Sequence, residues 1–98
     1  MNSSKKLVIN HLVTMRKKYN LFTLERCAAD NHVTIQTVRN FENHVSTNAK
    51  LMLYYINRIL WELGNNELYL SNLDGVDIEE VRKDRVITIF LLTKSYYI

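Results

Sequence analysis

Proline is absent from this sequence of 98 residues, glycine occurs twice and cysteine once. Proline and glycine most often interrupt regular structure, so their scarcity favours helices joined by short connections. The single cysteine, Cys27, excludes an internal disulfide and fits a reducing cytoplasm. Long apolar runs are missing too: residues 7–9 are too short for the core of a signal peptide, and residues 86–92 are too short for a membrane helix of about 20 residues. We therefore expect a cytoplasmic protein without a membrane segment.

Acidic residues are scarce in the first part of the chain. Residues 1–58 carry nine Lys and Arg against three Asp and Glu, a net charge of +6, whereas residues 59–98 carry four against seven, a net charge of −3. The overall composition, 47% hydrophobic and 23% charged, is that of an ordinary soluble globular protein. The basic first part indicates a polyanionic partner for that part of the chain.

Apolar side chains at helical spacing predict a first helix over residues 5–19, namely Val8, Leu12, Met15 and Tyr19. Thr23 and Thr34 then stand where N-caps of two further helices are expected, because a threonine hydroxyl can accept a hydrogen bond from a free N–H in the first turn. Their spacing of eleven residues leaves room for a helix of about eight residues and a short turn. Asn48 is a third cap candidate, opening a longer helix that residues 64–66 end.

The C-terminal part has a different pattern. Asp77 and Glu80 resemble a capping box and predict a short helix to about Lys83. Residues 86–92 are β-branched or bulky without a helical period, which predicts a strand. Such a strand needs a partner, which can be residues 67–70, the same strand of a second copy, or both. We expect a mainly α protein with a helical domain over residues 1–63 and a strand-containing extension over residues 64–98, through which two copies would dimerise.

Residues 23–28 (TLERCA) and 33–42 (VTIQTVRNFE) resemble the helix-turn-helix of the phage repressor and Cro family, whose fold is the lambda-repressor-like bundle. The resemblance covers roughly residues 7–61. His32 stands at a turn position where that family has glycine, and histidine is among the residues that tolerate φ > 0. Glu42 matches a family glutamate that pairs with a basic residue of the first helix, by spacing Lys17, with Arg16 as second choice. His44 replaces a further family glycine.

The resemblance implies that residues 34–42 form a recognition helix in the major groove of double-stranded DNA. Val38 and Phe41 would then face inward. By position, Ile35, Gln36 and Asn40 match base-contacting sites; glutamine and asparagine can bond adenine through N6 and N7, and isoleucine can meet a thymine methyl. Arg39 suits a guanine or a phosphate. The side chains assigned to phosphate contacts are Thr34, Thr37, Asn43 and Lys50.

Nothing in the sequence indicates catalysis. Glycine-rich phosphate loops, paired catalytic carboxylates and nucleophile–histidine arrangements are not found, and the three histidines do not form a metal-ligand spacing with Cys27. We expect neither an enzyme nor a bound cofactor or metal.

Two functions remain open at this point. The first is a sequence-specific transcriptional regulator, a phage-type repressor or Cro-like protein that binds a palindromic operator as a homodimer. The second is a protein-interaction module, an antirepressor or inhibitor that uses the helix-turn-helix scaffold or the C-terminal extension to bind a protein. The basic first part and the polar outward side of residues 34–42 favour the first.

Overall fold

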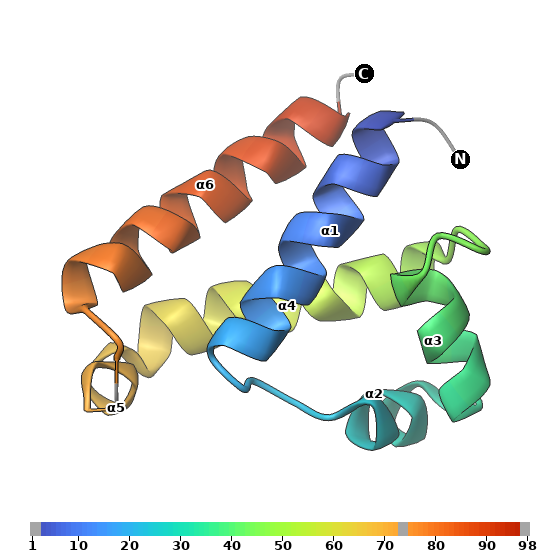
Figure 1. The fold of residues 1–98 in the computed structure, drawn as a ribbon, viewed down its shortest axis with the longest axis horizontal. Helices are drawn as coiled ribbons and strands as arrows, with labels where there is room; N and C mark the ends of the chain where they lie inside the picture. The colour runs from blue at the N-terminus through green and yellow to red at the C-terminus, as the bar shows by residue number, and fades with distance from the viewer. Residues whose placement is uncertain (1–2, 73–74, 97–98) are drawn as a thin grey trace.

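The computed structural model describes residues 3–72 and 75–96, which form six helices and no strand. The mainly α fold class is therefore confirmed. Figure 1 shows the helices in chain order, which are α1 (Ser3–Lys18), α2 (Leu24–Asn31), α3 (Ile35–Glu42), α4 (Ala49–Asn65), α5 (Glu67–Ser71) and α6 (Ile78–Tyr96). None of these described helices is long and apolar enough to cross a membrane.

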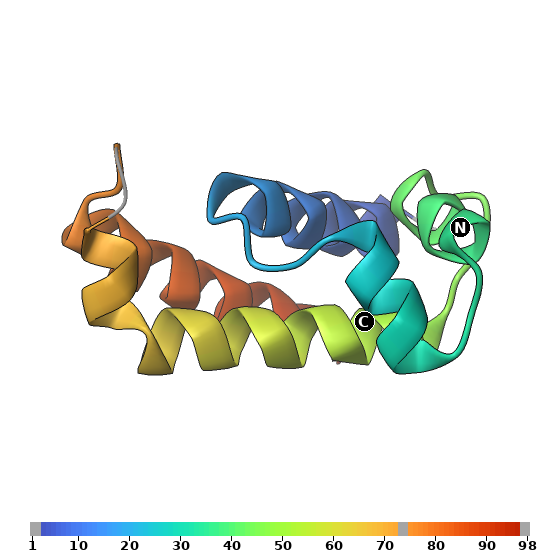
Figure 2. The same cartoon turned by 90° about the horizontal axis from the view of Figure 1, so that it is seen from below.

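The longest dimension of the molecule follows α4, and the other helices pack around it. Helix α1 crosses α4, while α2 and α3 gather at one end and α5 lies at the other (Figures 1 and 2). Helix α6 returns from α5 and contacts both α1 and α4. Consequently α1 and α4 lie between α3 and α6, and these two helices present separate surfaces of the protein (Figure 1).

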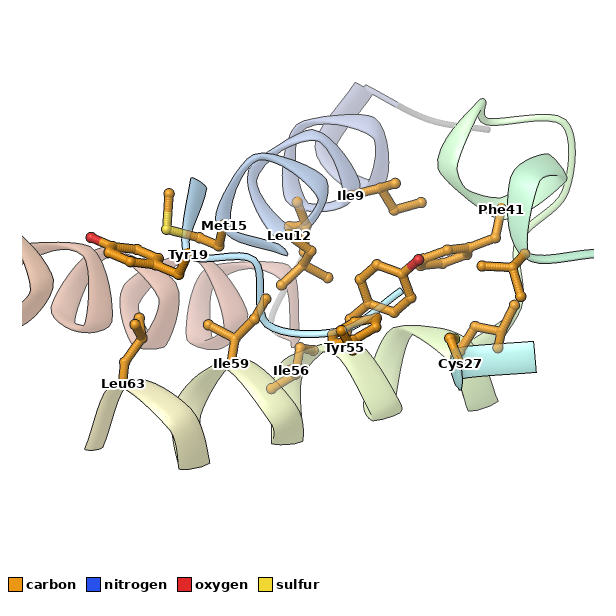
Figure 3. Packing of buried hydrophobic residues seen from close by; sticks show 14 of the residues in the cluster. Ile9, Leu12, Met15, Tyr19, Cys27, Phe41, Tyr55, Ile56, Ile59 and Leu63 are labelled. Carbon is orange, nitrogen blue, oxygen red and sulfur yellow. The ribbon is translucent and has the colours of Figure 1, made fainter. Parts of the chain in front are cut away.

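A continuous apolar core joins α1 to α4 and extends into the short helices. Figure 3 shows side chains of α1 facing those of α4, with Cys27 of α2 and Phe41 of α3 at one end of the cluster. Leu70 and Val81 belong to the same core, so the core extends beyond residues 1–63, the range expected for the helical domain. Burial raises the pKa of Cys27 to about 11, and its thiol therefore stays protonated at neutral pH.

The three predicted N-caps are confirmed. The hydroxyl of Thr23 accepts from the N–H of Arg26 at 3.0 Å, and that of Thr34 accepts from the N–H of Thr37 at 3.1 Å. The side chain of Asn48 caps α4 in the same way: its Oδ1 accepts from the N–H of Leu51, the third residue of that helix, at 3.1 Å. Each cap satisfies a backbone donor that the first turn of a helix leaves free, which fixes where the helix begins.

The strand predicted for residues 86–92 is wrong, and so are the short helix ending near Lys83 and the strand pairing with residues 67–70. Residues 86–92 are helical within α6, which runs unbroken from Ile78 to Tyr96, and residues 67–70 lie in α5. Tertiary packing along one face of α6 overrides the β propensity of these residues.

The buried face of α6 is partly polar. For this reason the apolar residues of the segment do not show the spacing of three and four by which a helix is predicted. Val81, Asp84 and Thr88 recur at spacings of three and four and are all buried. The opposite side carries exposed apolar residues, which we call the outer face of α6: Val86, Ile89 and Phe90. A pattern that reads only apolar residues therefore misses the side on which the helix packs.

Hydrogen bonds between α1 and α6 satisfy this buried polar face. The Asp84 carboxylate accepts from the Tyr19 hydroxyl and, at 2.8 Å, from the Lys18 ammonium. The Thr88 hydroxyl donates to the backbone carbonyl of Asp84 at 2.8 Å. Its single proton is thereby used, so His11 Nε2, 2.7 Å away, must be the donor to the Thr88 oxygen. Such a fully satisfied network holds α6 on α1 in one register.

We predict that His11 makes stability depend on pH. Burial lowers the pKa of His11, an effect that the charge of Asp84 opposes in part, so the folded protein favours the neutral ring. The stabilisation is complete above about pH 6.5, the ordinary histidine value, and is lost as pH falls through the lowered pKa. Urea unfolding at pH 7.5 and pH 5 should show wild type losing more stability than His11→Gln.

The control for this experiment is His32→Asn, which changes an exposed histidine and should keep the pH dependence of wild type. If His11→Gln and wild type lost the same stability between the two pH values, the neutral ring would not be favoured by the fold.

Candidate nucleic-acid interface

Three residues connect α2 to α3, and their geometry fixes how the two helices meet. His32 adopts the left-handed conformation at φ 55°, as predicted from the sequence. The N–H of Val33 donates to the carbonyl of Ala28 at 3.0 Å, which closes the end of α2. Asn31 is buried just before the turn, and its amide donates to the Cys27 carbonyl at 2.8 Å, so this polar side chain is satisfied within its own helix.

One side of α3 is buried in the core and the other is open to solvent. Val38 and Phe41 are 0% exposed, which confirms that they face inward. Gln36 and Arg39 are exposed. Ile35 is half-buried against the core, so only part of its side chain is available for contact with a ligand.

The solvent side of α3 carries two hydrogen-bonded pairs. Gln36 Nε2 donates to Asn40 Oδ1 at 2.9 Å, and the hydroxyls of Thr34 and Thr37 are 2.9 Å apart. Asn40 and Thr37 are half-buried. Three of these side chains form what we call the outer face of α3: Gln36, Arg39 and Asn40.

The remaining predicted contact residues lie beside α3 rather than on its outer face. Asn43 is exposed at the C-terminal end of α3, where its N–H donates to the Arg39 carbonyl at 2.9 Å. Lys50 belongs to α4 and donates to the backbone carbonyl of Asn31 at 2.8 Å. Its positive charge therefore also stabilises the C-terminal end of α2, where carbonyls lack partners within the helix.

A largely buried ion pair holds α3 on α1 and α4. The Arg16 guanidinium donates to both oxygens of Glu42, at 2.8 and 2.9 Å, and the Tyr55 hydroxyl donates to the same carboxylate at 2.6 Å. The expected pairing of Glu42 with Lys17 is wrong: Lys17 is exposed, while Arg16, the second choice, faces α3. Burial disfavours the charge of Arg16, but the bonds and charge of Glu42 outweigh it and raise the pKa of Arg16.

The loop after α3 is fixed by a second histidine in the left-handed conformation. His44 has φ 63°, and its Nε2 donates to Asn10 Oδ1 at 2.8 Å. This contact with α1 was not expected from the sequence. Its only signal was a histidine at a position that suits glycine, since histidine tolerates φ > 0 better than most residues.

A hollow of about 300 Å³ lies next to this loop at the N-terminal end of α4, lined by Lys5, Thr47, Asn48, Ala49 and Met52. Lys5 and Thr47 were not among the predicted contact residues. The signals in the sequence that could have pointed to this place are its basic start and the cap at Asn48. Free N–H groups at a helix start and a nearby lysine are groups that suit an anion.

The charges around α3 are unevenly distributed. The first turn of α3 contains no acidic residue, and within residues 3–72 and 75–96 no carboxylate forms an ion pair with Arg39. The first turn of α2, in contrast, carries the exposed Glu25, which disfavours a phosphate at that helix end. An anionic ligand therefore fits the outer face of α3 better than the start of α2.

Comparison of the chain with protein-family models, with curated proteins and with solved structures found no match. Among the described residues, no group of three His, Cys, Asp or Glu side chains is placed to hold a metal ion. The function must therefore be inferred from the geometry and charge of the protein itself.

Proposed function

We propose that the protein is a sequence-specific DNA-binding transcriptional regulator with a lambda-repressor-like helix-turn-helix, of the phage repressor and Cro type. The observation that carries the proposal is the outer face of α3. It presents two amides and an arginine on a short helix whose other side is anchored in the core. Amide and guanidinium groups are the side chains that read base edges in the major groove.

The scaffold suits this role because α3 is held rigidly before any DNA is present. Val38 and Phe41 anchor the helix by burial, and Glu42 ties its last turn to Arg16 and Tyr55. A helix fixed in this way loses little conformational entropy on binding, so more of the contact energy is available for affinity. In addition, the left-handed residues His32 and His44 stand where the resembled family has glycine, which supports the family assignment.

Each candidate contact has a chemical role under this proposal. The amides of Gln36 and Asn40 read base edges, and the exposed part of Ile35 meets a thymine methyl. Arg39 contacts a guanine or a phosphate. The residues assigned to phosphates, which fix orientation rather than sequence, are Thr34, Thr37, Asn43 and Lys50.

We further propose that two copies bind DNA together, with the outer face of α6 as the contact between them. Val86 and Phe90 are 61% and 63% exposed, and no charged residue lies between them and Ile89 on this face. A two-fold axis makes such a patch complementary to itself. Because α1 and α4 separate α3 from α6, such a contact would leave the outer face of α3 free in both copies.

A second candidate function is a protein-interaction module, an antirepressor or inhibitor. The observation that favours it is the same outer face of α6, because exposed Val86, Ile89 and Phe90 also suit the apolar surface of a different protein. This function requires no contribution from Arg39, and therefore the two candidates differ in what a variant of Arg39 should do.

We predict that DNA binding weakens steeply with salt and depends on Arg39. Cations that neutralise phosphates displace condensed counterions, so the dissociation constant should rise strongly between 50 and 200 mM salt. If the guanidinium reads guanine, Arg39→Ala should cost about 1–3 kcal/mol of binding free energy. If it contacts a phosphate, the variant should lower the salt slope, the slope of log affinity against log salt concentration, by about one. Fluorescence anisotropy with labelled duplexes measures both quantities.

The matched control is Lys83→Ala, which removes an exposed positive charge from α6, on the other side of α1 and α4 from α3. It should leave both the affinity and the salt slope close to wild type. Equal effects of Arg39→Ala and Lys83→Ala would mean that the protein binds DNA through general charge and not through α3. Absence of binding at any salt would favour the protein-interaction module.

A further inference from the structure

The hydrogen bond between Gln36 and Asn40 restricts what each side chain can read. A side-chain amide has one carbonyl oxygen that accepts and one NH₂ group that donates twice. Gln36 Nε2 uses one of its protons on Asn40 Oδ1, at 2.9 Å. Gln36 therefore keeps its carbonyl oxygen and one N–H for a ligand. Asn40 turns its carbonyl oxygen toward Gln36, which uses one of the two lone pairs of that oxygen, and both N–H donors of its NH₂ group stay available.

These two sets of free groups match different bases. The oxygen and remaining N–H of Gln36 complement the N6 amino group and N7 of adenine, which offer one donor and one acceptor. Asn40 is less suited to reading adenine with both ends of its amide, because its oxygen is oriented toward Gln36 and already accepts one hydrogen bond. Its two N–H donors instead complement the O6 and N7 of guanine, which both accept. Cytosine offers only a donor in the major groove and is rejected by an NH₂ group.

We propose, on the basis of the proposed DNA-binding function, that Gln36 and Asn40 act as one coupled reading unit that selects adenine and a nearby guanine. Four residues of helix rise about 6 Å, so the two bases lie one or two base pairs apart. The bond fixes the orientation of both amides before DNA arrives, and therefore removal of either side chain weakens recognition by the other. This refines the sequence-based expectation, in which both amides were suited to adenine.

The variant Asn40→Asp distinguishes the coupled unit from the alternative in which Gln36 and Asn40 each recognise a base independently of the other. Aspartate keeps an oxygen that can accept from Gln36 Nε2 but has no NH₂ group, and a carboxylate accepts from the N4 amino group of cytosine. The variant should keep the adenine preference and exchange guanine for cytosine, although its negative charge lowers affinity for every sequence. Asn40→Ala should instead lose the guanine preference and also weaken the adenine preference, because Gln36 loses its support.

The experiment is selection from a library of randomised DNA duplexes with wild type, Gln36→Ala, Asn40→Ala, Asn40→Asp and the double alanine variant. Anisotropy titrations of the selected duplex then give the dissociation constants. We expect each alanine variant to weaken binding to the wild-type site by about tenfold to a hundredfold. If the two residues acted independently, the loss of affinity in the double variant would equal the product of the two single losses. We expect a loss smaller than that product by at least about threefold, because the effects of coupled residues are not additive.

Three results would overturn the coupled unit while leaving the proposed function intact. The first is loss of the adenine preference in Asn40→Ala but not in Gln36→Ala. The second is a double variant whose loss of affinity equals the product of the two single losses. The third is an Asn40→Asp protein that still prefers guanine. Enrichment of no sequence by wild type would contradict the proposed function itself, and the coupled unit with it. Circular dichroism of each variant confirms that these substitutions on the solvent side of α3 leave the fold unchanged.

Discussion

Replacing Glu42 with alanine is expected to lower the free energy of unfolding by about 3–5 kcal/mol. The side chains of Arg16 and Glu42 are only 11% and 9% exposed, so the variant leaves a guanidinium with little access to water and without its carboxylate. The Tyr55 hydroxyl loses its acceptor at the same time. Small domains are stable by about 5–15 kcal/mol in total, so this loss is a large share of the whole.

Urea unfolding followed by circular dichroism measures this change. Arg82→Ala is the control, because Arg82 pairs with Glu67 at an exposed position and should leave the midpoint unchanged. The double variant Arg16→Met/Glu42→Leu should recover much of the stability, since apolar side chains of similar size can replace a buried pair. If Glu42→Ala were as stable as wild type, the ion pair would not be what holds α3 in place.

Replacing Asp84 with alanine is expected to cost about 3 kcal/mol, through the loss of hydrogen bonds to charged and buried groups. Asp84 is the acceptor for the hydroxyl of Tyr19, which is 2% exposed, and for the ammonium of Lys18. Burial raises the pKa of Tyr19, and its hydroxyl therefore stays protonated and needs an acceptor. Without Asp84 the register of α6 on α1 is no longer fixed by this network.

The matched control is Glu79→Ala, which removes an exposed carboxylate from the same helix and should change stability little. The comparison uses thermal and urea unfolding of the full chain, with Tyr19→Phe as a further variant that removes only the hydroxyl. A stable Asp84→Ala protein would contradict the role of the network. Equal losses for Asp84→Ala and Glu79→Ala would show that charge at α6, and not the buried bond, is responsible.

Local signals predicted α2, α3 and the turn between them well. Thr23 and Thr34 were recognised as caps because each hydroxyl acts within three residues of its own position, and both caps are confirmed. The left-handed turn at His32 and the burial of Val38 and Phe41 follow from equally local rules of spacing. Contacts of this range can be deduced from a single sequence because they require no knowledge of distant elements.

Features that depend on distant segments could not be deduced in the same way. Residues 86–92 of α6 were predicted as a strand because the buried face of this helix uses Asp84 and Thr88, whose partners lie on α1 and just after it, far away in the sequence. Glu42 was assigned to the wrong neighbour on α1: the apolar positions of this helix place Lys17 opposite its buried face, where it is exposed, whereas Arg16 lies about 100° away at the edge of that face. The bond between Gln36 and Asn40 joins side chains whose orientations no sequence pattern specifies.

The central claim, that the outer face of α3 binds DNA, is tested most directly by nuclear magnetic resonance. Backbone and side-chain amide signals of the ¹⁵N-labelled protein are followed while a duplex obtained by selection is added. We predict that the amide signals of Gln36, Arg39 and Asn40 shift strongly. The backbone signal of Tyr69, which is exposed on α5 at the other end of α4, should not change. Shifts confined to α5 or α6, with the signals of α3 unchanged by any duplex, would contradict the claim.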